Sequence, residues 1–369
     1  MLKWAAFWLL LLVALCPAPA PAIPLFAHQY GVTCAKCHSV IPHLNEFGAA
    51  FLAYGERFPG ISSGPAFPLS VKVNAVDSSA YQGDGPDGRG LPKAIVDEVE
   101  AFTSATIGPR ANFFVEQYLV DGGEPGLLRD AWIGERVNPW QARIPVYLQG
   151  GQFTLPLPVD PETFRDTYQG YAPYSQVVGA NPFDFFDPAI GMRVGVGDPL
   201  RGASAQLFAG PGYTRQSGLA ATGVDTELYA QDAMGAFTLS TFRYDGLRPI
   251  AGGPSDRFER TGFGFTYGQW SRFSSELVLI DGSDSNCGMP GSTACASSGG
   301  FEQLHYAFNR LFAEARYEGT NDPANGLRRD GVILLGYGPT ENTRLTIEDV
   351  IAHSPQTTNT MNAQFTVAY

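Results

Sequence analysis

The sequence predicts a mainly β fold, an outer-membrane β-barrel of about sixteen antiparallel strands preceded by a small α-helical segment. Three observations support this fold class. The 369 residues include 43 glycines and 28 prolines but only 16% charged residues, which favours strands and turns over helices. From residue 67 onward, short runs alternate apolar and polar residues, the period of a strand with two unlike faces. Short turns also alternate with longer polar loops, as they do in outer-membrane barrels.

The first 22 residues have the features of a secretory signal peptide. Lys3 supplies a positive charge, an apolar run follows from Ala5 to Leu15, and small residues lie at positions 20–22. A membrane anchor is the alternative interpretation, but this apolar run is shorter than the roughly 20 residues that a spanning helix needs. We therefore expect residues 1–22 to be a signal peptide that is removed on export.

Cys34, Cys37 and His38 form the pattern C-x-x-C-H, the attachment motif of c-type haem. In this spacing, two thiols can bond to one edge of the porphyrin while the adjacent imidazole coordinates the iron. A disulfide or redox pair is the alternative use of the two cysteines, but that use leaves His38 without a role. The motif therefore predicts one covalent haem c, with His38 as an axial ligand of the haem iron.

The second axial ligand of the haem iron is not specified by the motif, because no methionine lies between Met1 and Met192. His28 and His43 are the local candidates. An extended chain of five residues, the separation of His43 from His38, spans at most roughly 17 Å, so His43 could just reach the opposite haem face. His28 approaches from the other side of the motif. A five-coordinate iron and a ligand from the later domain are further alternatives, and each histidine could equally be a surface residue.

Residues 23–66 are predicted to form a small monohaem cytochrome c-like segment. Leu44, Phe47, Phe51 and Leu52 fit one face of a short helix. A segment this small seldom folds without a covalent or tertiary staple, and the haem would be that staple. We expect the segment to pack against the larger region that follows it.

Residues 67–369 are predicted to form the barrel. Leu304, Tyr306 and Phe308 share one face of a predicted strand, while Gln303 and His305 share the other. The chain ends in an aromatic strand, as outer-membrane barrels do. An even number of strands would put both chain ends on the periplasmic side. A soluble β-sandwich also alternates, but it rarely runs for so many residues as one unit.

Longer polar loops are expected at the end of the barrel that faces outward. They span residues 82–90, 121–126, 156–189, 210–224, 246–256, 281–300, 319–328 and 354–359. Cys287 and Cys295 lie in one of these loops, where an oxidising location favours a local disulfide. A metal pair is the weaker alternative, because no histidine lies nearby. Five charged or titratable residues on the polar faces should project into the lumen: His305, Glu314, Arg316, Arg344 and Glu348.

Charge and hydropathy exclude two further classes of protein. The formal net charge is −12 and no block of basic residues occurs, whereas a nucleic-acid surface needs clustered lysine or arginine. Past the signal there is no run of 18 apolar residues, so the sequence contains no transmembrane helix. Insertion among outer-membrane lipids would therefore require the barrel.

Residues 22–48 read A-I-P-L-F-A-H-Q-Y-G-V-T-C-A-K-C-H-S-V-I-P-H-L-N-E-F-G. This segment resembles the fused monohaem c-type cytochrome-porins of the outer membrane, an iron-oxidising family. The family pattern is approximately A-x-P-x-F-A-R-Q-T-G-x-x-C-x-x-C-H-x-x-x-P-x-L-x-x-F-G. His28 and Tyr30 depart from it, because the family usually has arginine and threonine at these positions. Beyond residue 48 the resemblance is one of architecture alone.

The resemblance implies an electron-transfer conduit in the cell outer membrane, an iron(II):cytochrome oxidoreductase. An extracellular donor, typically Fe(II), would pass one electron to a haem held beneath the barrel or in its lumen. A periplasmic c-type cytochrome would then accept that electron. Two alternatives remain: a conduit for another donor, such as a second reduced metal, a sulfur compound or a partner cytochrome, and a porin for solute diffusion whose haem segment is structural or regulatory.

Overall fold

The computed structural model describes residues 25–53, 56, 69–81, 94–108, 110–138, 142–181, 183–211, 223–250, 254–269, 271–288, 294–354 and 356–368. The predicted signal peptide, residues 1–22, lies outside the described residues, as does the predicted boundary between the two domains near residue 66. No described helix is both long and apolar enough to cross a membrane.

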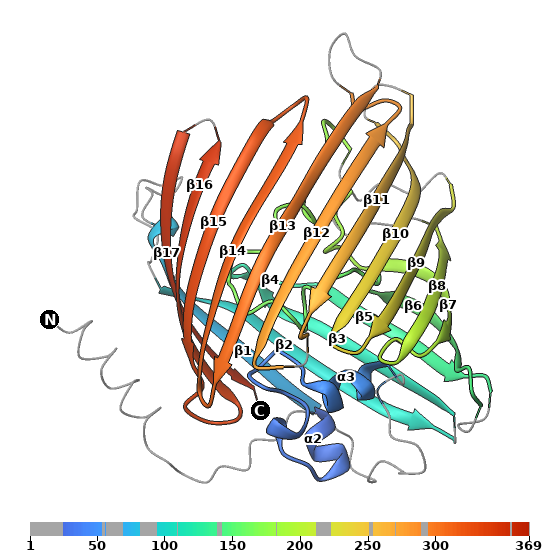
Figure 1. Cartoon of the computed structure of the whole chain (residues 1–369), viewed down its shortest axis with the longest axis vertical. Coiled ribbons are helices and arrows are strands. Elements are labelled where there is room, and N and C mark those ends of the chain that lie inside the picture. The colour runs from blue at the N-terminus through green and yellow to red at the C-terminus, as the bar shows by residue number, and fades with distance from the viewer. Residues whose placement is uncertain are drawn as a thin grey trace, which may run out of the picture.

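The strands form one antiparallel sheet that closes on itself, because β1 pairs with both β2 and β17 (Figure 1). β4 is a two-residue strand at the tip of the β3 hairpin, so the described wall has sixteen full strands. This result confirms the predicted fold class. The strands are β1 (Leu69–Ser78), β2 (Ala94–Ile107), β3 (Ala111–Asp121), β4 (Glu124–Pro125), β5 (Leu128–Arg136), β6 (Val146–Phe153), β7 (Ala189–Gly197), β8 (Gly202–Gly210), β9 (Asp225–Met234), β10 (Phe237–Arg248), β11 (Asp256–Tyr267), β12 (Phe273–Asp284), β13 (Cys295–Phe308), β14 (Leu311–Asp322), β15 (Gly326–Tyr337), β16 (Thr343–Ser354) and β17 (Gln356–Ala368).

The strand faces alternate as the sequence predicts. In β13, Leu304 and Tyr306 are 42% and 51% exposed, whereas Gln303 and His305 are at most 1% exposed. Apolar side chains therefore face outward and polar ones inward, the pattern of a barrel that meets lipid outside and is filled inside. All five predicted lumenal residues are buried: His305, Glu314, Arg316, Arg344 and Glu348.

The two ends of the barrel differ in the length of their connections. At one end the hairpins close in short turns, such as residues 235–236 between β9 and β10 and residues 309–310 between β13 and β14. Asn309 and Gly235 have φ angles of 55° and 67°, the left-handed backbone that two-residue hairpin turns require. The long connections, including residues 154–188, lie at the other end.

Three of the predicted loops are wrong in extent. Residues 281–300 are mostly strand, since β12 continues to Asp284 and β13 begins at Cys295. β14 and β15 are separated only by residues 323–325, and β16 and β17 only by residue 355. The glycine, serine and threonine content of these segments predicted loops. In a barrel, however, small polar residues also suit strand ends that face the lumen on alternate positions.

The N-terminal segment comprises the helix α2 (Leu25–Tyr30), the short helix η1 (Cys34–Lys36) and the helix α3 (Glu46–Ala53). It lies at the short-turn end of the barrel, beside the C-terminus (Figure 1). The Phe26 ring stacks on Phe114 of β3 with centroids 6.2 Å apart, and Leu44 belongs to the barrel's buried core. The expected packing of this segment against the barrel is confirmed.

The connection 154–188 folds into the lumen and fills much of it. Tyr171 is fully buried and stacks on Phe301 of β13 at 4.4 Å. Glu348 accepts hydrogen bonds from the backbone nitrogens of Tyr168 and Gln169, at 2.7 and 3.1 Å. Backbone groups that enter a barrel must be satisfied by such partners. Four of the five predicted lumenal residues therefore contact this inner loop: His305, Arg316, Arg344 and Glu348.

Candidate functional site

The C-x-x-C-H motif forms one compact turn at the mouth of the barrel. The backbone nitrogens of Cys37 and His38 both donate to the carbonyl oxygen of Cys34 at 3.0 Å. Both cysteines are free thiols, and His38 is bridged to Leu44 across the turn. The two thiols and the imidazole line the same cavity. Burial raises the pKa of Cys34 to about 11 and also raises the pKa of Cys37, so both thiols are protonated at neutral pH.

The orientation of the His38 ring is fixed by the backbone. Its Nδ1 lies 2.9 Å from the carbonyl oxygen of Pro42. A carbonyl only accepts, so Nδ1 carries the proton and Nε2 keeps its lone pair. Burial lowers the pKa of His38, which favours this neutral form. Metal-bound histidines in proteins are typically held by such a bond from their second nitrogen.

The cavity has a volume of about 970 Å³ and lies between the N-terminal segment and the barrel wall. Apolar side chains from the segment and the wall cover one part of it, including Phe26, Leu44, Phe51, Phe102 and Phe114. Charged groups line another part, including Lys72, Glu98, Glu100, Glu116 and Arg129. A pocket with apolar walls, two thiols and one free imidazole nitrogen fits a covalently attached haem, whose faces are apolar and whose edge carries the thioether bonds.

Gly48 allows α3 to pack directly on the motif. A Cβ atom at this position would lie 2.1 Å from the carbonyl oxygen of Cys37 and 2.9 Å from Leu44 Cδ2. The start of α3 is set by Asn45, whose side-chain oxygen accepts from the nitrogens of Phe47 and Gly48 at 3.0 Å each. Glycine is therefore required at position 48, because the backbone of α3 lies too close to the motif for a side chain.

His43 does not line this cavity, and the structure places it in a second cluster with Asp166 and His305. The rings of His43 and His305 stack with centroids 4.3 Å apart. Asp166 Oδ2 lies 2.9 Å from His305 Nδ1 and 3.8 Å from His43 Nδ1. The side chain of His28 lies outside the described residues. The prediction that His28 or His43 is the second axial ligand therefore stays a prediction.

Burial governs the protonation of this second cluster. All three side chains are at most 1% exposed. Burial lowers the pKa of His43 to about 4, so its ring is neutral at pH 7. Burial opposes ionisation of Asp166, but His305, His43 and Arg344 outweigh it and lower the pKa of that carboxyl. Sequence reasoning singled out both histidines but missed Asp166, because nothing in the inner loop distinguishes this aspartate from its neighbours.

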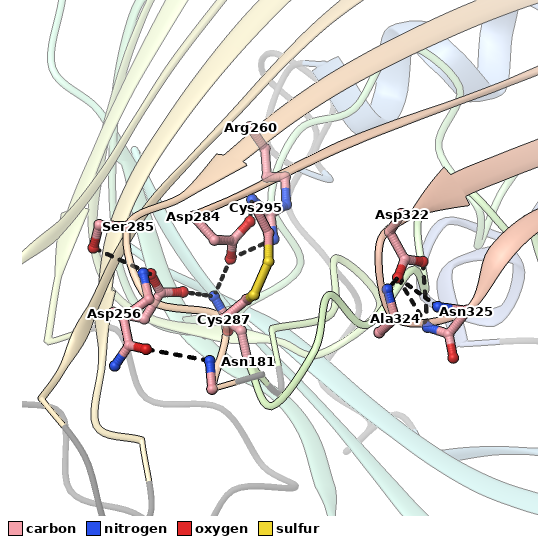
Figure 2. Close-up of a disulfide and its surroundings, with 12 residues drawn as sticks. Asn181, Asp256, Arg260, Asp284, Ser285, Cys287, Cys295, Asp322, Ala324 and Asn325 are labelled. Atoms are coloured by element: carbon pink, nitrogen blue, oxygen red, sulfur yellow. Dashed lines mark hydrogen bonds and ion pairs between the residues drawn. A yellow bond between two sulfur atoms is a disulfide. The ribbon is translucent and has the colours of Figure 1, made fainter. Parts of the chain in front are cut away.

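Cys287 and Cys295 form a disulfide at the long-loop end, with Cα atoms 6.0 Å apart (Figure 2). The disulfide lies beside the point where the inner loop meets the wall. Asn181 of that loop donates to Asp256 at 2.8 Å and to Asp284 at 2.9 Å, while the nitrogen of Ala180 donates to the carbonyl of Cys287 at 2.8 Å. The disulfide thus stabilises the rim that holds the inner loop.

Neither a family model nor a curated protein matches the sequence. Solved structures match most of it. The outer membrane channel DcaP of Acinetobacter baumannii has a TM-score of 0.57 at 11% identity, covering 85% of this chain and 100% of that one. Salmonella typhi OmpF, in a complex with daunomycin, has a TM-score of 0.58 at 12% identity, covering 82% and 97% of the two chains. An anion-selective porin from Comamonas acidovorans has a TM-score of 0.58 at 11% identity, covering 82% and 99%.

The chain has the fold of an outer-membrane porin. At these identities the likeness establishes the fold alone. The porin fold accounts for the apolar outer and polar inner faces of the strands. The likeness to porins gives no information about the cavity beside Cys34, Cys37 and His38.

Proposed function

We propose that this porin-fold protein carries one covalent haem c on Cys34, Cys37 and His38 and conducts electrons across the outer membrane. The observation that carries the proposal is the convergence of both thiols and the free His38 Nε2 on one cavity of about 970 Å³ beside the barrel wall. The resemblance of residues 22–48 to fused cytochrome-porins is a second support, because it extends beyond the C-x-x-C-H motif itself.

Each residue of the motif has a distinct task under this proposal. When bound, haem supplies one-electron redox chemistry, while the protein sets access and potential. Cys34 and Cys37 would hold the haem through thioether bonds, and His38 Nε2 would bind its iron, with the imidazole oriented by the Pro42 carbonyl. Phe26 and Phe51 exclude water, their rings meeting edge to face at 4.8 Å. His28 or His43 would supply the sixth ligand.

The direction of electron flow and the identity of the donor follow from the resemblance. The donor is extracellular Fe(II), and the acceptor is a periplasmic c-type cytochrome that docks near the N-terminal segment. A net charge of −12 favours a cationic donor over an anionic one. Oxidation outside the cell also keeps the insoluble ferric product out of the periplasm.

A porin for solute diffusion is the second candidate function, and the fold comparisons favour it over electron transfer. Charges of both signs also line the cavity, with Lys72 2.6 Å from Glu100 and Arg129 2.9 Å from Glu162. Such a lining is suited to hydrated solutes. In this case the haem segment would be structural or regulatory.

The test is to express the full chain in a host that matures c-type cytochromes, isolate the outer membrane and record reduced-minus-oxidised spectra with anaerobic Fe(II). We expect covalent haem, rapid reduction by Fe(II), and loss of covalent haem in Cys34→Ala/Cys37→Ala. The matched control, Cys287→Ser/Cys295→Ser, should keep its haem. Covalent haem that ignores Fe(II) but accepts another donor would overturn the iron assignment alone. Absence of covalent haem together with ion conductance in planar bilayers would favour the diffusion porin.

A further inference from the structure

We propose that His43, Asp166 and His305 bind one divalent transition-metal ion of the Fe(II) and Zn(II) class, separate from any haem iron. The three residues come from three parts of the chain: the N-terminal segment, the inner loop and β13. One ligand atom from each lies within 4.8 Å of the other two. Ligands that share an ion at about 2.0–2.2 Å lie at most about 4.4 Å apart. The 2.9 and 3.8 Å separations of Asp166 Oδ2 from the two Nδ1 atoms satisfy this limit, and the stacked imidazole rings would turn so that both lone pairs meet the ion.

The atoms that face one another are unsatisfied. His43 Nδ1, His305 Nδ1 and Asp166 Oδ2 have no hydrogen-bond partner among the described residues, although all are buried. The 2.9 Å contact between His305 and Asp166 is close enough for an ion pair but is not aligned as a hydrogen bond. Buried polar atoms without partners are costly, and one bound ion would satisfy His43 Nδ1 together with the ion-paired atoms of His305 and Asp166.

The tautomer of His43 suits metal binding. Its Nε2 lies 3.4 Å from the carbonyl oxygen of Gln269, in the turn between β11 and β12. Because the carbonyl accepts, Nε2 carries the proton and Nδ1 presents a lone pair toward Asp166. A backbone carbonyl that fixes the second nitrogen is the usual companion of a metal-bound imidazole.

The surrounding charge favours a cation. Glu314 lies directly opposite His305 in the β13–β14 pairing, and Glu276 lies on the neighbouring strand β12. Oxygen atoms of both glutamates are buried without hydrogen-bond partners. The nearby positive groups are Arg344, 3.5 Å from Asp166 Oδ1, and Arg316, 3.3 Å from Glu314. The unpartnered carboxyl oxygens of Glu276 and Glu314 could therefore interact with added positive charge.

The donor set limits the choice of ion. Two imidazoles and one carboxylate suit Fe(II), Zn(II) and related first-row ions, and they disfavour Ca²⁺ and Mg²⁺, which prefer oxygen ligands. Bound metal would tie the N-terminal segment to the inner loop and the wall. It would also occupy His43, which leaves the sixth haem position to another ligand. The alternative is a metal-free cluster in which protonated His305 pairs with Asp166.

The experiment uses the purified full chain, chelator-stripped and then titrated with Zn(II), with haem iron counted separately. We expect one Zn(II) per chain, and at least tenfold weaker binding in both His43→Gln and His305→Gln. His353→Gln, which changes an exposed histidine of β16, is the matched control and should bind as the wild type does. Gel mobility before and after heating reports whether each barrel is folded.

X-ray absorption at the zinc edge of the wild type provides a measurement that does not depend on any variant folding. We expect two imidazole nitrogens at about 2.0–2.1 Å and oxygen in the remaining positions. Wild-type protein that binds no more Zn(II) than folded His305→Gln, or a zinc shell of oxygen alone, would overturn the proposal. So would loss of a bis-histidine haem spectrum in His43→Gln. Covalent haem content is measured independently of these outcomes, so the metal site and the haem can fail separately.

Discussion

At the scale of single residues, the C-x-x-C-H motif is recognisable in the sequence because its residues are contiguous, and the haem that it indicates stays a prediction. Cys34, Cys37 and His38 need only one turn of backbone to share a cavity wall. The partnership of Asp166 with His305 could not be predicted, since no sequence period links a loop residue to a strand residue so far along the chain. Only closure of the barrel and insertion of the loop bring these two side chains to 2.9 Å.

Gly48 provides a test of the packing between α3 and the motif. We predict that Gly48→Ala reduces covalent haem per chain and destabilises the N-terminal segment by about 1–3 kcal/mol, because the new methyl would meet the Cys37 carbonyl. Haem-stained gels and the rate of proteolysis at residues 25–56 measure the two effects. Ala50→Ser in the same helix is the control. Full haem content and unchanged proteolysis in Gly48→Ala would show that the segment does not need this contact.

Asp184 provides a pH test in the inner loop. Burial is the main cause that raises its pKa to about 7, with a further contribution from the nearby Asp187. The folded state therefore favours the protonated acid, and the stability this contributes is complete below the unfolded value of about 3.9 and is lost as pH rises through 7. We predict that wild-type thermal stability falls between pH 5 and pH 8, and that Asp184→Asn shows less of this fall.

The control for this pH test is Asp232→Asn, which changes an exposed aspartate of β9 and should leave the pH dependence of the wild type intact. Unfolding temperatures at pH 5 and pH 8, measured on purified protein, compare the three proteins. An Asp184→Asn variant with the same fall as the wild type would assign the pH dependence to other groups.

At the scale of elements, period-2 alternation predicted the strands of the barrel well, because every strand has one lipid face and one lumenal face. Loops were harder to predict. The Gly/Ser-rich run that contains Cys295 reads as a loop but forms the start of β13, where it pairs with β12. The inward course of residues 154–188 could not be predicted either, since its anchors lie on strands far along the sequence.

Removal of the disulfide tests the attachment of the inner loop at the rim. We predict that Cys287→Ala/Cys295→Ala lowers stability by about 2–3 kcal/mol, the loop-closure value for a sequence separation of 8 residues. The variant should still carry covalent haem, because the disulfide lies at the opposite end from the motif. Unfolding temperature with and without reductant gives the comparison. A wild type that is insensitive to reductant would contradict this role.

The charged anchors of the inner loop test whether it closes the lumen. Arg316 of β14 donates to Thr167 at 2.8 Å and to the Gln169 carbonyl at 2.7 Å. Glu348 of β16 accepts a hydrogen bond from the loop backbone. We predict that Arg316→Ala/Glu348→Ala loosens the loop and raises single-channel conductance in planar bilayers at least twofold. Arg243→Ala, which removes an exposed ion pair with Glu259, is the control. Equal conductance in all three proteins would show that the loop does not limit passage.

At the scale of the whole molecule, the fold and the proposed function rest on different parts of the sequence. The barrel follows from repetition over about 300 residues, which is why solved porins match it at only 9–12% identity. The proposed electron transfer would depend on a few residues at the mouth of the barrel, and the fold alone does not decide it. Docking of the N-terminal segment on the barrel is what joins the motif to the membrane-spanning wall.

The proposed passage of electrons across the membrane through this chain can be measured in proteoliposomes. Haem-loaded wild type would be inserted into vesicles that enclose oxidised cytochrome c, and anaerobic Fe(II) held by an impermeant chelator would be added outside. We expect rapid reduction of the enclosed cytochrome with the wild type and none with Cys34→Ala/Cys37→Ala, whose barrel should still insert. Equal reduction by the two proteins, or none by haem-loaded wild type, would rule out an electron conduit through this chain.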